Sequence, residues 1–213
     1  MPRKAPLVFA LLLVLTAIGV ALYAAATAPT SESVAAGAAP ATIEPAPSRP
    51  TAGSRADGPG VDVALKQLEL MKPARARLAE DFTLPTPAGD TFRLSEQRGK
   101  VVLVNFWATW CPPCLEEMPA MERLYRQHRD GGFTLVAVSV DADSKVVAPF
   151  VTAHKFSFPV ALDPSMNMAN TYGVRALPSS FIVARDGTLA ALAIGPRHWD
   201  NDAAHSLIEG LAR

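Results

Sequence analysis

Two cysteines, Cys111 and Cys114, are the only thiols in the chain, and two residues separate them. The apolar run 101–104 precedes them and predicts a strand, and the pattern over 115–129 predicts a helix. A C-x-x-C pair between a strand and a helix is typical of a thiol–disulfide redox site. At a helix start, unpaired N–H groups and the positive end of the dipole stabilise a thiolate, which is the nucleophilic form. We therefore expect Cys111 to attack and Cys114 to resolve the mixed disulfide.

Pro112 and Pro113 suit the first turn of such a helix, because their missing N–H would be unpaired there anyway. Two cysteines cannot close a Cys-only zinc site. The histidines (His128, His154, His198 and His205) show no metal-site spacing and are interpreted as surface or packing residues. The formal net charge is zero, which gives no indication of a nucleic-acid partner.

The N-terminus carries the signal of membrane targeting. Arg3 and Lys4 precede an apolar run, and residues 5–30 contain no Asp, Glu, Lys or Arg. This run reaches the roughly 20 residues that span a bilayer, and the preceding positive charge favours a cytoplasmic N-terminus. Residues 1–28 are therefore predicted to form a membrane anchor; a cleaved signal sequence is the alternative, because 26–28 resembles a cleavage site. Either way the rest lies outside the cytoplasm, and the anchor places it at the periplasmic side of the inner membrane.

Composition divides the remainder into three parts. Residues 29–60 are rich in Pro, Ala and Ser and poor in large apolar residues, which predicts a disordered tether. Residues 61–78 have apolar positions at helical spacing and predict a short lead-in helix, with either a packing or a spacer role. Residues 79–213 are predicted to form the compact domain.

The order of elements in that domain predicts an α/β fold: a mixed sheet flanked by helices. A hairpin comes first, then a strand–helix–strand unit, a strand–helix insert, a second hairpin around an Asp-Gly turn, and a closing amphipathic helix. The predicted strands are 82–84, 91–94, 100–106, 133–140, 158–162, 180–184 and 189–194, and the predicted helices are 111–128, 143–155, 164–172 and 201–212.

Over residues 81–213 the chain resembles the thioredoxin superfamily, and within it the TlpA-like group of membrane-anchored, extracytoplasmic thiol–disulfide oxidoreductases. The resemblance rests on V-N-F-W-A-T-W-C-P-P-C (104–114), E-E-M-P (116–119), Y-G-V-R-A-L-P (172–178), F-I-V (181–183) and D-G (186–187).

The resemblance implies a cis peptide at Leu177–Pro178, beside the reactive cysteine, where the backbone before the proline pairs with a bound client peptide. It also implies that Trp110 covers the active-site surface, while Trp107 packs in the interior. Asn105 occupies the position of a buried aspartate in thioredoxin proper, and an amide cannot move protons as that aspartate does.

Glu117 follows Cys114 by three residues and so shares its helix face. It matches a glutamate with which some relatives tune their cysteines; a solvated helix glutamate is the alternative. Glu116 is expected to face solvent.

The leading hypothesis is a reductant of client-protein disulfides that acts in cytochrome c maturation or in copper-site assembly of an oxidase. A membrane electron donor would re-reduce it, and it would need no cofactor beyond the Cys111–Cys114 disulfide and no partner copy. Two alternatives stay open. The first is a Cu(I) chaperone with Cys111, Cys114, Met166 and Met168 as ligands, because thiolates and thioethers suit that ion. The second is an oxidant that introduces disulfides.

Overall fold

The computed structural model describes residues 59–213, so the predicted anchor and nearly all of the predicted tether lie outside the described residues. In the described part, no helix combines the length and the apolar character that crossing a membrane requires.

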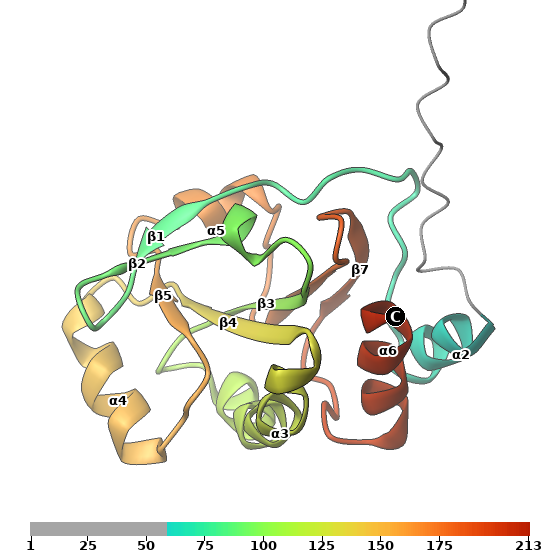
Figure 1. The fold of residues 1–213 in the computed structure, drawn as a ribbon. Helices are drawn as coiled ribbons and strands as arrows, with labels where there is room; N and C mark the ends of the chain where they lie inside the picture. Colours follow the sequence, from blue (N-terminus) through green and yellow to red (C-terminus); the bar gives the residue numbers. More distant parts are fainter. Residues whose placement is uncertain (1–58) are drawn as a thin grey trace, which may run out of the picture. The chain divides into compact units, whose positions relative to one another are not determined.

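A five-stranded mixed sheet in the order β5-β4-β3-β6-β7 organises the domain (Figure 1). Strands β3 (Val101–Trp107), β4 (Phe133–Ser139) and β5 (Val160–Leu162) run parallel, and β6 (Ser179–Val183) and β7 (Leu189–Ile194) are each antiparallel to their inner neighbour. Every residue of β3 and β4 is buried, as expected of central parallel strands that read as continuous apolar runs. The predicted mixed α/β sheet flanked by helices is thus confirmed.

Side chains alternate between the two faces of β3. On one face Phe106 packs in an aromatic cluster with Phe82 and Tyr172, below the hairpin of β1 (Thr83–Pro85) and β2 (Thr91–Arg93). On the other face lie α3 (Pro112–His128) and α6 (Asp202–Ala212) (Figure 1). The side chains of β3 that point toward α3 can therefore reach the helix that carries Cys114.

The active-site helix α3 has Cys111 as its N-cap and retains Pro119 in its interior. It leads into a short 3-10 turn, η3 (Arg129–Gly131), and Gly132 then takes a left-handed conformation with φ of 84°. A residue with a side chain is strained there, which explains why a glycine pair stops the helix.

The segment after β4 differs from the sequence prediction in detail. The helix predicted over 143–155 is divided into a 3-10 turn, η4 (Ser144–Val146), and α4 (Val147–His154). The helix predicted over 164–172 is shorter: α5 spans only Asn167–Thr171. The reason is local, because Met166 adopts a left-handed conformation with φ of 56°. The carboxylate of Asp163 still caps the helix by accepting the N–H of Ala169 at 2.8 Å.

Helix α2 (Pro59–Gln67) packs against α6, so the lead-in has the packing role rather than the spacer role. Its buried side chains are Val61, Ala64 and Leu65, and Leu68 follows in the next turn. The lead-in also runs along the second hairpin, where Met71 forms a β-bridge with Leu192. These contacts make the lead-in a part of the core.

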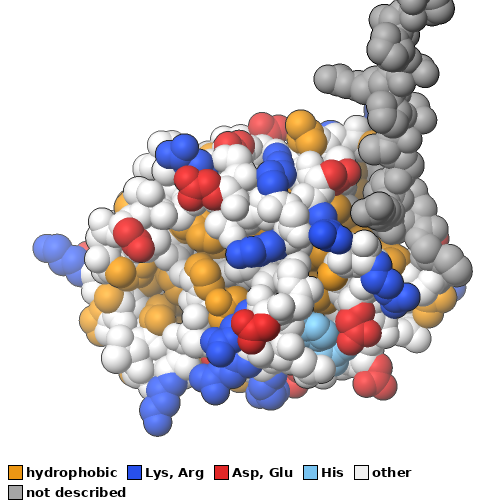
Figure 2. Space-filling model, viewed as in Figure 1, with side chains coloured by type: hydrophobic (Ala, Val, Ile, Leu, Met, Phe, Trp, Pro, Cys, Tyr) orange, Lys and Arg blue, Asp and Glu red, His pale blue; other side chains and the backbone are white. Residues whose placement is uncertain are grey.

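Acidic and basic side chains are interspersed on the face shown in Figure 2, in keeping with the zero net charge. Hydrophobic side chains reach this surface where the β1–β2 hairpin meets α4 and β5 (Figure 2). A pocket of about 400 Å³ lies there, with Phe92, Val151, Phe158 and Val160 among its lining residues. The edge strand β5 and the β1–β2 hairpin therefore border a hollow with apolar side chains in its lining.

Candidate active site

The turn between β3 and Cys111 is held by one buried carboxylate, that of Asp141 just beyond the end of β4. It accepts the backbone N–H of Thr109 at 3.0 and 3.2 Å and the Thr109 hydroxyl at 2.7 Å. The hydroxyl of Ser139 donates to the same carboxylate at 2.8 Å. Sequence reasoning missed Asp141; the available signal was an acidic residue at the carboxyl end of the strand parallel to β3.

Cys111 and Cys114 form a disulfide with an S–S distance of 2.05 Å and Cα atoms 5.3 Å apart. Cys111 lines a surface pocket, whereas Cys114 is fully buried. Because Pro112 and Pro113 occupy the first two helical positions, the first backbone N–H of α3 belongs to Cys114. This differs from the expectation of several unpaired N–H groups around the Cys111 thiolate. Of the two sulfur-bearing residues, Cys111 is the one that a partner can reach from the pocket.

Glu117 is buried, with a residual exposure of 3%. Its Oε1 accepts the amide N–H of Asn105 at 2.8 Å. Its Oε2 accepts the backbone N–H of Arg197 at 2.9 Å and the indole N–H of Trp199 at 3.0 Å. Burial raises the pKa of Glu117 to about 7, against the opposing effect of these donors and of the Arg197 charge. The solvated-glutamate alternative is therefore wrong, whereas the neighbouring Glu116 is exposed as predicted.

Asn105 lies on β3 directly under the active-site helix. Besides Glu117, its Nδ2 donates to the hydroxyl of Ser180 at 3.0 Å. In the described part of the chain, Asn105 Oδ1 and the indole nitrogen of Trp107 are the two buried side-chain polar atoms without a hydrogen-bond partner. Asn105 thus donates to the Glu117 carboxylate through Nδ2, and its Oδ1 is an acceptor without a partner among the described residues.

The peptide bond Leu177–Pro178 is cis, as the resemblance implies. The hydroxyl of Ser179 donates to the carbonyl of Ala176 at 2.7 Å, and the N–H of Gly195 donates to the carbonyl of Pro178 at 2.8 Å. Leu177 itself makes no hydrogen bond with any other described residue. Its backbone N–H and C=O are therefore unpaired within the described part of the chain.

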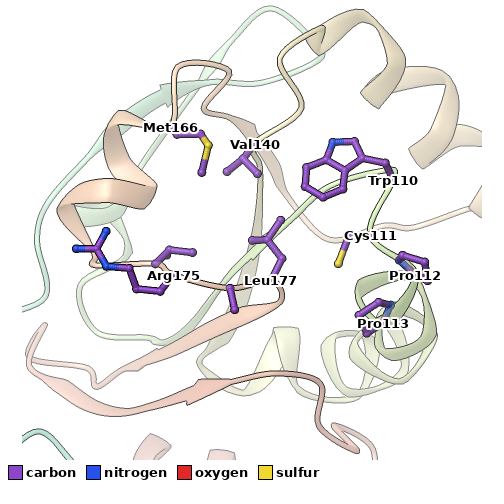
Figure 3. A pocket seen from close by; sticks show the side chains of 10 residues that line it. Trp110, Cys111, Pro112, Pro113, Val140, Met166, Arg175 and Leu177 are labelled. Carbon is purple, nitrogen blue, oxygen red and sulfur yellow. The ribbon is translucent and has the colours of Figure 1, made fainter.

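This loop faces Cys111 across a pocket of about 450 Å³ (Figure 3). The lining is apolar except for one cation, Arg175, at the opposite end from Cys111 (Figure 3). The lining residues are Trp110, Cys111, Pro112, Pro113, Val140, Met166, Val174, Arg175, Ala176 and Leu177.

The aromatic and thioether residues separate clearly by position. Trp107 is fully buried, whereas Trp110 is 67% exposed and lines the pocket, so both lie where they were expected to lie. Met166 lines the Cys111 pocket, but Met168 packs partly buried against the core and is absent from the lining. Of the two candidate thioethers, the structure thus places one in the pocket that Cys111 lines. No group of three His, Cys, Asp or Glu side chains suited to a metal ion occurs among residues 59–213.

Comparisons with known proteins agree with this geometry. The model of the AhpC/TSA family matches residues 76–192. Two proteins named thiol-disulfide oxidoreductase ResA are similar over 117 residues, which are 55% of this chain. The protein from Halalkalibacterium halodurans is 36% identical over 66% of its own length, and that from Bacillus anthracis is 38% identical over 68% of its length.

Two solved structures share the fold. A putative thiol:disulfide interchange protein DsbE from Chlorobium tepidum has a TM-score of 0.61 and 33% identity, over 68% of this chain and 99% of that one. StoA from Bacillus subtilis has a TM-score of 0.51 and 28% identity, over 62% and 96% of the two chains. The chain therefore belongs to the AhpC/TSA family of thioredoxin-like proteins, and its C-x-x-C domain is that of a thiol–disulfide oxidoreductase.

Proposed function

We propose that the protein reduces disulfides of client proteins outside the cytoplasm, with Cys111 as nucleophile and Cys114 as resolving thiol. The observation that carries this is the pairing of two features across one pocket. One side presents the Cys111 sulfur, and the other presents Leu177, whose backbone is unpaired beside the cis Pro178 (Figure 3). A client strand that pairs with Leu177 would bring its own disulfide to Cys111.

The reaction balances as a two-electron exchange. The Cys111 thiolate attacks one client sulfur, which breaks the client S–S bond, forms a mixed disulfide and releases one client thiolate. Cys114, once deprotonated, attacks the Cys111 sulfur and releases the second client thiolate. The product is the Cys111–Cys114 disulfide, which is the state in the structure.

Glu117 can take part in the proton chemistry of this second step. It follows Cys114 by one helical turn, and its pKa of about 7 allows both protonation states near neutral pH. Its ionised form raises the pKa of a nearby thiol, whereas its neutral form does not.

The cellular setting follows from the N-terminal sequence and the resemblance. We propose that residues 1–28 anchor the protein in the inner membrane, with the C-x-x-C domain on the periplasmic side. A membrane dithiol donor re-reduces the disulfide, and the clients are proteins of cytochrome c maturation or of oxidase copper-site assembly.

The pocket lining suggests the chemistry of the client segment. Leu177 lies between Cys111 and Arg175, and Val140 and Met166 line the same pocket (Figure 3). Arg175 forms no hydrogen bond or ion pair with the other described residues. A client with an apolar side chain beside its cysteine and an acidic one farther along would fit. Matched peptides with aspartate or lysine at the distal position test this, and an Arg175→Gln variant should lose the preference for aspartate.

Trapping tests the central proposal. A Cys114→Ala variant should accumulate a mixed disulfide with an oxidised peptide that carries an apocytochrome C-x-x-C-H segment. Cys111→Ala is the matched control and should trap nothing, because Cys114 is buried. Absence of an adduct through Cys111, under conditions in which the wild type reduces the same peptide, contradicts the proposed mechanism.

The direction of electron flow has its own measurement. A reductant should equilibrate with glutathione at a potential near that of thioredoxin, about −270 mV, whereas a value near about −120 mV would identify an oxidant.

A further inference from the structure

The donors that hold Glu117 come largely from a segment far away in the sequence. The loop between β7 and α6 supplies both partners of Oε2, the backbone N–H of Arg197 and the indole of Trp199. The third donor is the Asn105 amide, from β3. The position of the β7–α6 loop therefore determines how well the carboxylate is held.

The side chain of Arg197 fixes this loop to the end of α2. Its Nε donates to the carbonyl of Leu68 at 2.8 Å, and its Nη2 donates to the carbonyl of Glu69 at 3.2 Å. Its Nη1 donates to the carbonyls of Gly195 and Pro196 in its own loop, at 3.2 and 2.8 Å, and to that of Ile194 at the end of β7. Carbonyls just beyond a helix end are the favoured partners of a cation, so the guanidinium joins α2 and the loop.

Few other polar contacts join α2 to this loop. A pocket of about 300 Å³ opens between them, lined on one side by Gln67, Leu68 and Glu69 and on the other by Pro196, Arg197, His198 and Asn201. Helix α2 has only nine residues, too few to be stable alone in water, so its position depends on its docking to α6. At that interface Val61 approaches so closely that a Cβ on Gly210 would lie 2.6 Å from its side chain.

We propose that Arg197 is a positioning residue that couples the docking of α2 to the proton affinity of Glu117. The redox consequence rests on the proposed function, because it requires that Glu117 tunes the cysteines. When α2 leaves α6, Arg197 loses the carbonyls of Leu68 and Glu69 and its loop is released. The carboxylate then loses a backbone donor and a nearby cation, and both losses make it bind its proton more tightly, whereas any water that enters with the released loop acts in the opposite direction.

The charge that lowers the pKa of Glu117 is that of Arg197. The other groups that face Glu117 are the neutral amide of Asn105 from β3 and the indole of Trp199 from the loop. Cys114 precedes it by one turn on α3 itself and does not titrate in the disulfide form. In the oxidised protein, a change in the titration midpoint of Glu117 therefore reports a change in the position of the β7–α6 loop.

NMR of the oxidised protein provides the test. The chain has three tryptophans, hence three indole N–H signals, and the Trp199 indole donates directly to Glu117. Its chemical shift should follow the Glu117 titration, with a midpoint near pH 7 in the wild type. Arg197→Met should raise the midpoint by about one pH unit. Leu65→Glu, which places a charge in the α2–α6 contact and leaves Arg197 in place, should raise it in the same direction.

Arg185→Met is the matched control, because Arg185 likewise donates to carbonyls at a helix end, those of Ala212 and Arg213. It should lower the thermal midpoint without moving the titration. Arg197→Lys keeps a cation at this position and should raise the midpoint by less than Arg197→Met does. An unchanged midpoint in either Arg197→Met or Leu65→Glu overturns the coupling. The measurement needs no client and no reduction, so failure of the trapping assay would leave this result standing.

Discussion

Replacing Glu117 with glutamine should make the protein's stability less dependent on pH. The substitution keeps the shape of the side chain and removes its titration. Glu117 lies on the buried face of the active-site helix, and the three hydrogen bonds that its carboxylate accepts replace only part of the hydration lost on burial. The charged form is therefore the costly one in the folded state.

The magnitude follows from the shift of the pKa. A rise from 4.5 to about 7, at ~1.4 kcal/mol per unit, corresponds to about 3 kcal/mol of unfolding free energy. The sign is that of an acid that binds its proton more tightly when folded. The penalty is absent below the unfolded pKa of 4.5, grows as the pH rises, and is complete above about 7.

Urea unfolding of the oxidised protein at pH 4.5 and pH 8.5 measures this penalty. The free-energy difference between Glu117→Gln and wild type should change by roughly 2–3 kcal/mol in favour of the variant at the higher pH. Effects of the amide that do not depend on pH cancel between the two conditions. Glu116→Gln, on the exposed side of the same turn, is the control and should track the wild type. Parallel pH profiles for Glu117→Gln and wild type would refute the assignment of a raised pKa.

Further substitutions examine the rest of the site. Asn105→Asp would place a second carboxyl group within hydrogen-bond distance of Glu117, and two adjacent carboxylates cannot both ionise at low cost. Urea unfolding of this variant should therefore show a steeper loss of stability above pH 7 than in the wild type. Asp141→Ala leaves the Thr109 donors unpaired and should lower the unfolding free energy by roughly 2–4 kcal/mol, again by urea titration. Trp110→Ala should leave the thermal midpoint nearly unchanged, because the side chain is 67% exposed, yet slow peptide reduction in a stopped-flow assay.

The central sheet was predictable because its signals are local. Strands β3 and β4 are nearly continuous apolar runs, as expected of strands that are buried on both faces. The Asp186–Gly187 turn marks the second hairpin. The cysteine spacing placed the redox pair at the start of α3 for the same reason. Every one of these patterns is complete within a few residues.

The partners of Glu117 were not predictable in this way. Arg197 and Trp199 lie about eighty residues beyond it in the chain and reach it only after β7 and α6 have packed. No spacing rule joins residues across such a distance. The shortness of α5 was not predictable for a related reason. Methionine is not a helix-breaking residue, so the left-handed conformation of Met166 leaves no signal in the sequence.

The identity of residue 105 now has a physical explanation that the sequence alone did not supply. In the structure, Asn105 donates to Glu117 and leaves its own Oδ1 unpaired, which suits an ionised carboxylate. When Glu117 is protonated on that oxygen, a half-turn of the amide would present Oδ1 as the acceptor instead. The hydroxyl of Ser180 can follow either orientation, since it both donates and accepts. An aspartate at this position could serve the neutral Glu117 but would oppose the charged one. An amide therefore lets a single glutamate titrate near pH 7 beneath the cysteines, without a second charge in the core.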